Sequence, residues 1–215
     1  MHVVIAGGHG QIALLLERRL ADNGDDAVGL VRNVDHVSEL EELGAHAAVV
    51  DLEESSVDEL VAVLNGSEAV VFAAGAGPGS GAARKETVDR DGAALLADAA
   101  EQAGIRRYLL VSSMGVDGAD PDSEDAFQVY LRAKAAAEEN LRSRDLDWTI
   151  VRPGRLTDET ATGRVRLAES VERGDIPRDD VAAVLHALLT SGGAVGRVLE
   201  LVGGDDEVDE AVAAA

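Results

Sequence analysis

The stretch Gly7-Gly8-His9-Gly10-Gln11-Ile12-Ala13 decides the fold that this sequence predicts. An apolar run at residues 3–6 precedes it and predicts a buried strand, whereas Ile12, Leu16 and Leu20 follow at the four-residue spacing of one helix face. A glycine-rich turn between a strand and a helix is the context in which a dinucleotide-binding fingerprint has physical meaning. The alternative is a glycine turn that merely ends a strand, but its place directly after the first strand favours nucleotide binding.

Each position of this turn has a physical role in holding a dinucleotide. Gly7 permits the tight turn, Gly10 lets the backbone approach a pyrophosphate, and the small Ala13 lets the helix pack closely on the strand. The free N–H groups and the positive dipole end of the helix then face the phosphates. We therefore expect cofactor contacts from Gly7, Gly8, His9, Gly10, Gln11 and Ile12.

Apolar runs alternate with helical patterns along the rest of the chain. Further strands are expected at residues 27–31, 47–50, 69–73, 108–111, 148–151 and 198–202. Long helices are expected at 82–103 and 126–142, with Ser55 or Ser56 capping a helix that ends near 64 and Asp179 capping one that ends near 189. This order predicts an α/β fold, a single Rossmann-type doubly wound, mostly parallel sheet of about seven strands with helices on both faces. We expect one NAD(P)-binding domain over residues 1–215, with a small substrate-side portion from about residue 153.

The composition narrows the class of protein. The 215 residues include no cysteine, which excludes disulfides and thiol chemistry, and no run approaches the roughly 20 apolar residues that span a bilayer. The sequence begins with the first strand and shows no basic segment of the kind that opens a signal peptide, so we expect a cytoplasmic protein. No metal site is predicted.

Acidic residues outnumber basic ones by 41 to 19, which gives a net charge of −22. A well-solvated surface is one interpretation, and adaptation of a halophilic protein to high salt is the one that we favour. Such a surface repels nucleic acid and anionic membranes, so we expect a small-molecule substrate as the partner, with the chain a monomer or a homodimer.

The ends of the strands supply further candidates, because ligands of such sheets bind beyond the carboxyl ends of the strands. Arg32, followed by Asn33, ends the second strand where a carboxylate would select NAD, and a guanidinium there suits the 2′-phosphate of NADP. The alternative for Arg32 is a surface arginine. Asp51-Leu52 could border the adenine or start a helix, and Ala74-Gly75 leaves room for a nucleotide or makes a simple turn.

Tyr130 and Lys134 form the second group of candidates. They lie one helical turn apart on the same face, in a chain with only two tyrosines and two lysines. A lysine beside a tyrosine favours the phenolate, and such a tyrosine can exchange a proton with a substrate oxygen while hydride moves to or from a nicotinamide. The alternative is a surface pair.

The order of these motifs resembles the atypical short-chain dehydrogenase/reductases, the NAD(P)-binding group similar to NAD-dependent epimerases and dehydratases. The resemblance covers nearly the whole chain and rests on residues 7–13, 51–52, 89–92, 111–113, 130–134 and 152–154. It implies a Rossmann fold that usually binds NADP. It also implies that Tyr130 is the acid/base, that Lys134 holds the nicotinamide ribose, and that Ser113 or Ser112 orients the substrate carbonyl. Pro153 and Arg155 would then line the nicotinamide.

The sequence departs from the family pattern at the active site. Asp89 stands at the usual asparagine, and Met114 lies at or near the serine position of the longer epimerases. The chain is also short, and because sugar-nucleotide epimerases carry a larger C-terminal substrate region, we expect a bulky nucleotide sugar to fit poorly. Two functions therefore remain: an NADP-dependent oxidoreductase of a small carbonyl, quinone or flavin-like substrate, and a non-catalytic NADP(H) sensor or scaffold.

Overall fold

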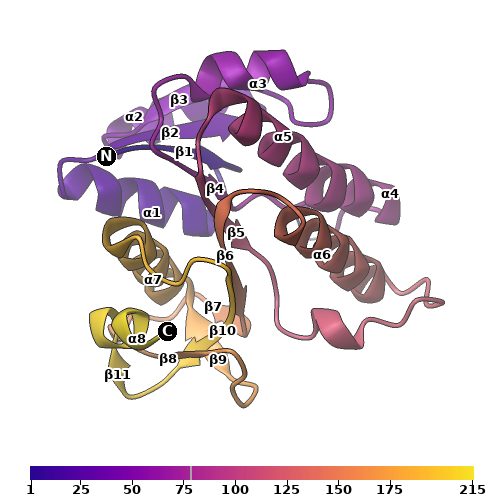
Figure 1. Ribbon diagram of the computed structural model, residues 1–215, viewed down its shortest axis with the longest axis vertical. Helices are drawn as coiled ribbons and strands as arrows, with labels where there is room; N and C mark the ends of the chain where they lie inside the picture. Colours follow the sequence, from indigo (N-terminus) through magenta and orange to yellow (C-terminus); the bar gives the residue numbers. More distant parts are fainter. Residues whose placement is uncertain (78) are drawn as a thin grey trace.

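A nine-stranded sheet forms the centre of the protein (Figure 1), as a computed structural model that describes residues 1–77 and 79–215 shows. Its strands are β1 (His2–Ala6), β2 (Asp26–Val31), β3 (His46–Val49), β4 (Ala69–Phe72), β5 (Arg107–Val111), β6 (Asp147–Pro153), β8 (Arg164–Ala168), β10 (Arg197–Gly203) and β11 (Asp206–Glu207). They follow the order β11-β8-β10-β6-β5-β4-β1-β2-β3. All neighbours from β3 to β10 are parallel, whereas β8 is antiparallel to both β10 and β11.

The mostly parallel α/β sheet confirms the predicted fold class, but the number of strands is higher than the predicted seven. A second, two-stranded parallel sheet joins β7 (Arg155–Thr157) to β9 (Asp175–Pro177). The unpredicted strands are two to five residues long, and each carries at least one charged residue. They lack the apolar runs that identify the central strands. These strands lie outside the fully buried centre of the main sheet, so at most one of their faces is covered.

Helices cover both faces of the main sheet (Figure 1). α1 (Gln11–Asp22), α2 (Val37–Glu42) and α7 (Arg178–Ser191) share one apolar core, which also receives α8 (Val208–Ala214). α3 (Val57–Leu64), α5 (Ala93–Ala103) and α6 (Ala126–Arg142) share the other. Successive residues of β1 alternate between the two cores, with Val3 and Ile5 in the first and Val4 and Ala6 in the second. Burial on both faces explains why the parallel strands are continuous apolar runs.

The predicted helix at 82–103 consists of three contiguous segments. α4 (Ala82–Arg84) leads into wide π-helical turns at Lys85–Gly92, which continue into α5. π-Helical turns occur frequently at functional sites. Here they bury Val88, Asp89 and Gly92 beside the carboxyl end of the sheet.

The predicted caps have mixed outcomes. Ser56 caps α3, because its hydroxyl accepts from the Glu59 N–H and Glu59 returns a hydrogen bond to the Ser56 N–H. The prediction for Asp179 is wrong, since Pro177 takes the N-cap position of α7. Asp179 lies in the first turn and accepts from Arg19 of α1 at 2.6 and 3.0 Å. No helix within residues 1–77 and 79–215 is long and apolar enough to cross a membrane.

Candidate cofactor and active site

The glycine turn between β1 and α1 lies close to the backbone that follows β4. The strand order of the sheet reverses between β1 and β4. Gly7 has a φ of +82°, and a Cβ on it would lie only 2.6 Å from the Cα of Ala74 at the end of β4. Gly10 occupies the N-cap of α1 and has no side chain to cover the first N–H groups of the helix. An uncovered helix N-terminus between β1 and β4 is suited to an anionic pyrophosphate.

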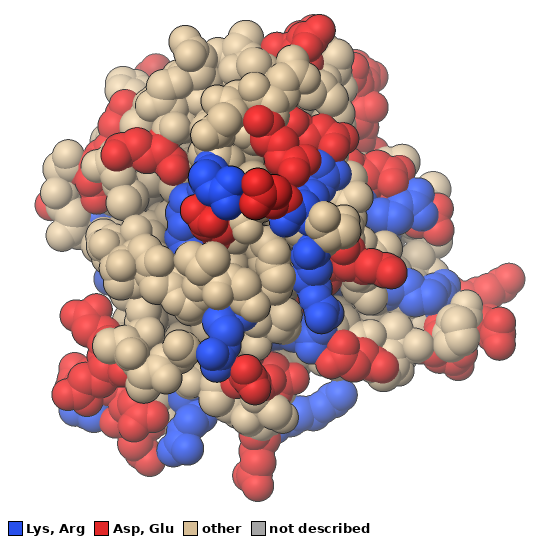
Figure 2. Space-filling view, in the orientation of Figure 1, with Lys and Arg blue, Asp and Glu red and all other residues tan. Residues whose placement is uncertain are grey.

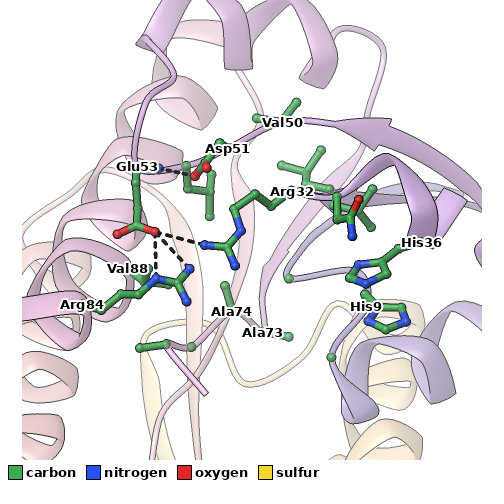
Figure 3. Close-up of a pocket in the computed structure, with 18 residues that line it drawn as sticks. His9, Arg32, His36, Val50, Asp51, Glu53, Ala73, Ala74, Arg84 and Val88 are labelled. Carbon is green, nitrogen blue, oxygen red and sulfur yellow. Dashed lines mark hydrogen bonds and ion pairs between the residues drawn. The ribbon is translucent and has the colours of Figure 1, made fainter. Parts of the chain in front are cut away.

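A cavity of about 400 Å³ opens beside this turn (Figure 3). It lies between the ends of β1, β2, β3 and β4, as the sequence predicts for a nucleotide. The sequence-predicted residues that line it are Gly7, His9, Gly10, Arg32, Asn33, Asp51, Leu52, Ala74 and Gly75.

Arg32 does not stand alone in this cavity. It comes within 3.6 Å of Glu53 Oε2, and Arg84 from α4 reaches the same oxygen at 3.0 Å (Figure 3). The Thr87 hydroxyl donates to Glu53 Oε1 at 2.6 Å. This hydrogen bond, together with Arg84, lowers the pKa of Glu53. The sequence did not reveal Arg84 or Glu53 as site residues, because neither ends a strand.

Other predicted residues of this cavity also organise the backbone. Asp51 accepts from the Glu53 N–H at 3.0 Å, and Asn33 accepts from the Asp35 N–H at 3.0 Å to cap the 3₁₀ turn Val34–His36. Asp51 is therefore a turn residue rather than the cap of α3. The His9 ring stacks on His36, with 3.5 Å between centroids, and so forms a side of the cavity.

Lys134 lies in an adjoining cavity of about 160 Å³ and is buried. Its ammonium donates to the carbonyls of Ala74 at 3.2 Å and Val111 at 3.1 Å, and it lies 3.2 Å from Asp89 Oδ1. The other oxygen of Asp89 accepts from the Ala76 N–H at 3.0 Å. The ammonium charge is thus already matched by a buried carboxylate, which the sequence did not indicate.

Tyr130 lies between the only two lysines of the chain. The Lys134 nitrogen is 5.9 Å from the centroid of its ring, and the nitrogen of Lys85, from the π-helical turns, is 5.6 Å away. Tyr130 and Ser113 line both the Lys134 cavity and a larger one of about 650 Å³. The structure therefore brings Tyr130, Lys134 and Ser113 together, as predicted, and adds Lys85.

Ser112 has a different environment from Ser113. Its buried hydroxyl donates to Glu138 Oε1 at 2.5 Å, and Arg152 forms a two-point ion pair with the same carboxylate at 2.9 and 2.6 Å. Arg152 also binds Asp117 in the loop after β5, at 2.6 and 3.0 Å. This network ties β5, β6 and α6 together. Both serines line the Lys134 cavity, but the Ser112 hydroxyl is held by Glu138, whereas Ser113 also lines the larger cavity.

The remaining predicted residues divide between these cavities and other places. Ile12 and Pro153 line the Lys134 cavity, and Arg155 lines the larger one, where it pairs with Asp175. Gln11 is exposed at a separate surface pocket. Gly8 packs on β2, because a Cβ there would lie 2.6 Å from the Cα of Gly29.

The three cavities form a continuous series along the carboxyl edge of the sheet. The first and second share Ala73, Ala74 and Gly75, and the second and third share Ser113 and Tyr130 among others. An extended ligand could therefore reach from Arg32 to Tyr130.

The residues present fit a nicotinamide dinucleotide. The glycine turn leaves room that a Cβ would fill, and the buried ion pair between Lys134 and Asp89 Oδ1 borders the Lys134 cavity. The Asp89 oxygen and the Lys134 ammonium suit the hydroxyl groups of a ribose. No cluster of three potential metal ligands occurs among residues 1–77 and 79–215.

Comparison with known proteins gives the same indication. The family model described as NAD(P)H-binding matches residues 7–192. The uncharacterized sugar epimerase YhfK of Bacillus subtilis is 37% identical over 213 residues, which cover 99% of each protein. A solved structure from Bacillus halodurans, provisionally described as an NAD-dependent epimerase/dehydratase, is 36% identical with a TM-score of 0.92 over 100% of both chains. The oxidoreductase ylbE from Lactococcus lactis is 27% identical with a TM-score of 0.86, over 100% of this chain and 96% of its own.

Proposed function

The chain belongs to the NAD(P)H-binding family, and from this membership we propose that it is an NADP-dependent oxidoreductase of a small carbonyl, quinone or flavin-like substrate. The observation that carries the proposal is the continuous series of cavities. It joins the open N-terminus of α1 to Tyr130, Lys134 and Ser113.

The preference for NADP rests on charge. Arg32 and Arg84 both reach into the cavity beyond β2, and together they offer two guanidinium groups to a 2′-phosphate. An arginine fork matches a phosphate in two-point geometry, which the hydroxyl of NAD cannot exploit.

The residues of the second cavity would then carry the chemistry. The bound cofactor supplies or accepts the hydride. Tyr130 donates or accepts the proton at the substrate oxygen, and the Ser113 hydroxyl orients that oxygen by a hydrogen bond. Lys134, fixed by Asp89 and by the carbonyls of Ala74 and Val111, holds the ribose.

A non-catalytic NADP(H) sensor is the second candidate, and one observation favours it. The Lys134 ammonium is already neutralised by Asp89 and bound by two carbonyl groups, so its role could be to join β4, β5 and α6. In that case the cofactor would bind without turnover.

The experiment that separates the two is NADPH oxidation against a panel of carbonyls, quinones and flavins. We expect turnover with at least one class, and Tyr130→Phe should lower it by about 10²–10⁴-fold while calorimetry shows an almost unchanged affinity for NADP. Tyr108→Phe is the matched control, because Tyr108 is fully buried in β5 and donates only to the carbonyl of Ala93. Tight NADP binding with no turnover, or full activity of Tyr130→Phe, would favour the sensor.

A further inference from the structure

The third cavity, beside Tyr130, is lined by three arginines and one acidic residue. Arg155, Arg173 and Arg178 line it together with Asp175. The whole chain has about two acidic residues for every basic one, so this local excess of positive charge runs against the composition. On the face that Figure 2 shows, acidic side chains are frequent around the outline, and basic side chains in the middle lie interspersed with acidic ones.

Two of the three arginines already have a carboxylate. Arg155 pairs with Asp175, and Arg178 lies 2.6 Å from Asp158. Arg173 has no acidic partner within 4 Å in the described part of the chain, although most arginines there have one. Its guanidinium charge is therefore free for a ligand.

Arg173 lines this cavity, and its guanidinium lies close to Gly115. Its Nη2 lies 3.2 Å from the position that a Cβ on Gly115 would take, so the guanidinium extends from the segment before β9 to the loop after β5. A Cβ at position 115 would require the guanidinium to shift slightly. The positive φ of +93° at Gly115 also fits a glycine there.

Apolar side chains also line this cavity. Phe127 is 57% exposed, and its ring stacks on Tyr130 with 6.0 Å between centroids and 28° between planes. Met114 and Leu156 also line the cavity. The only other phenylalanine, Phe72, is fully buried, so exposure is particular to Phe127 and not common to the phenylalanines of this chain.

We propose that the substrate is an amphipathic organic anion, a flat unsaturated carbonyl compound whose carboxylate is bound by Arg173 and whose apolar body lies on Phe127 and Tyr130. This proposal names the substrate class of the proposed oxidoreductase. That the anion is also reduced or oxidised rests on the proposed function. The repulsion from a chain of charge −22 acts at long range and is screened beyond about 8–10 Å at physiological salt, whereas the Arg173 contact is local.

Binding of two non-reacting probes to the protein saturated with NADP⁺ tests the proposal without turnover. Cinnamate and cinnamamide have the same flat shape and differ in charge, and calorimetry measures the dissociation constant of each. We expect cinnamate to bind about tenfold more tightly. Arg173→Met should remove this difference, and Arg173→Lys should keep part of it.

Two further variants distinguish charge from packing. Phe127→Ala should weaken both probes by a similar factor. Arg142→Met is the matched control, because Arg142 also lacks an acidic partner among the described residues but lies at the far end of α6, twelve residues from Tyr130. It should leave the preference for cinnamate unchanged.

Equal affinities for the two probes, equal losses of both in Arg173→Met, or no binding of either up to its solubility limit would overturn the proposal. Failure of the oxidoreductase function is a separate result. A carboxylate preference without NADPH turnover would leave the anion site standing and remove the reaction. Turnover of neutral carbonyls with no carboxylate preference would support the oxidoreductase function and remove the anion site.

Discussion

Glu53 supplies the negative charge that Arg32 and Arg84 share in the cofactor cavity. A 2′-phosphate carries the same sign and needs the same two guanidinium groups, so the carboxylate competes with it. The low pKa of Glu53 means that this competition persists throughout the neutral range.

Glu53→Gln should therefore tighten NADP binding by roughly fivefold and change NAD binding little, as calorimetry at one ionic strength would measure. Arg32→Ala in the same background should cancel the gain. A variant that weakens NAD and leaves NADP unchanged would show instead that Glu53 accepts a hydrogen bond from the NAD ribose.

Glu17 is a buried acid outside the site. It lies on α1 with no exposed surface, its Oε1 is close to Gly8 and Gly29, and neither carboxylate oxygen has a hydrogen-bond partner among the described residues. Burial raises its pKa from 4.5 to about 9. The folded protein thus keeps a proton that the unfolded chain releases above pH 4.5.

Stability should consequently fall as the pH rises from about 4.5 to 9, with Glu17 contributing at most about 1.4 kcal/mol per pH unit. Glu17→Gln cannot ionise, so its free energy of unfolding should exceed that of the parent increasingly over this range. Urea unfolding at several pH values measures the difference. A difference that does not change with pH would mean that water reaches the carboxylate.

A position at the end of a strand is the sequence signal that predicts which residues line the cavity beyond β2. Arg32, Asp51 and Ala74 follow strands, and they line the cofactor cavity. Arg84, Lys85 and Arg173 lie in helical turns or loops far along the chain, and only the tertiary fold brings them to the site. The choice between Ser112 and Ser113 also needed the structure, because only the contact with Glu138 separates them.

Among the elements, the central strands and the long helices followed from periodicity. Residues 126–142 form α6 with the predicted limits, since Asp125 caps a helix whose apolar face is regular. The C-terminal strands β7, β8, β9 and β11 were missed because they are short and show no regular apolar pattern. Pairing with neighbouring strands stabilises them. The wide turns at Lys85–Gly92 have no sequence signal, yet they place Lys85 and Asp89 at the site.

The charge of −22 belongs to the whole molecule and not to any single contact. Like charges repel across the surface and favour expansion of the chain, and counterions relieve this repulsion. We propose that the chain also unfolds as one unit, because its N-terminal and C-terminal parts pack in the same apolar core. That core contains Val3 of β1, Val181 of α7 and Leu201 of β10.

Thermal unfolding should accordingly show one transition whose midpoint rises as potassium chloride increases from dilute to molar concentration. Most of the rise should come below about 1 M, where the screening length has fallen to roughly 3 Å, since a continuing rise above it would indicate salting-out. A midpoint independent of salt would contradict the halophilic interpretation.

The small sheet of β7 and β9 has a consequence for how relatives of this protein diverge. It carries Arg155, Leu156 and Asp175 into the cavity beside Tyr130, but it is not hydrogen-bonded into the nine-stranded sheet that holds the glycine turn. We expect substitutions there to alter substrate recognition more than the fold of the glycine turn. The segment that shapes the outer cavity and the sheet that holds the glycine turn are therefore expected to tolerate substitution to different degrees.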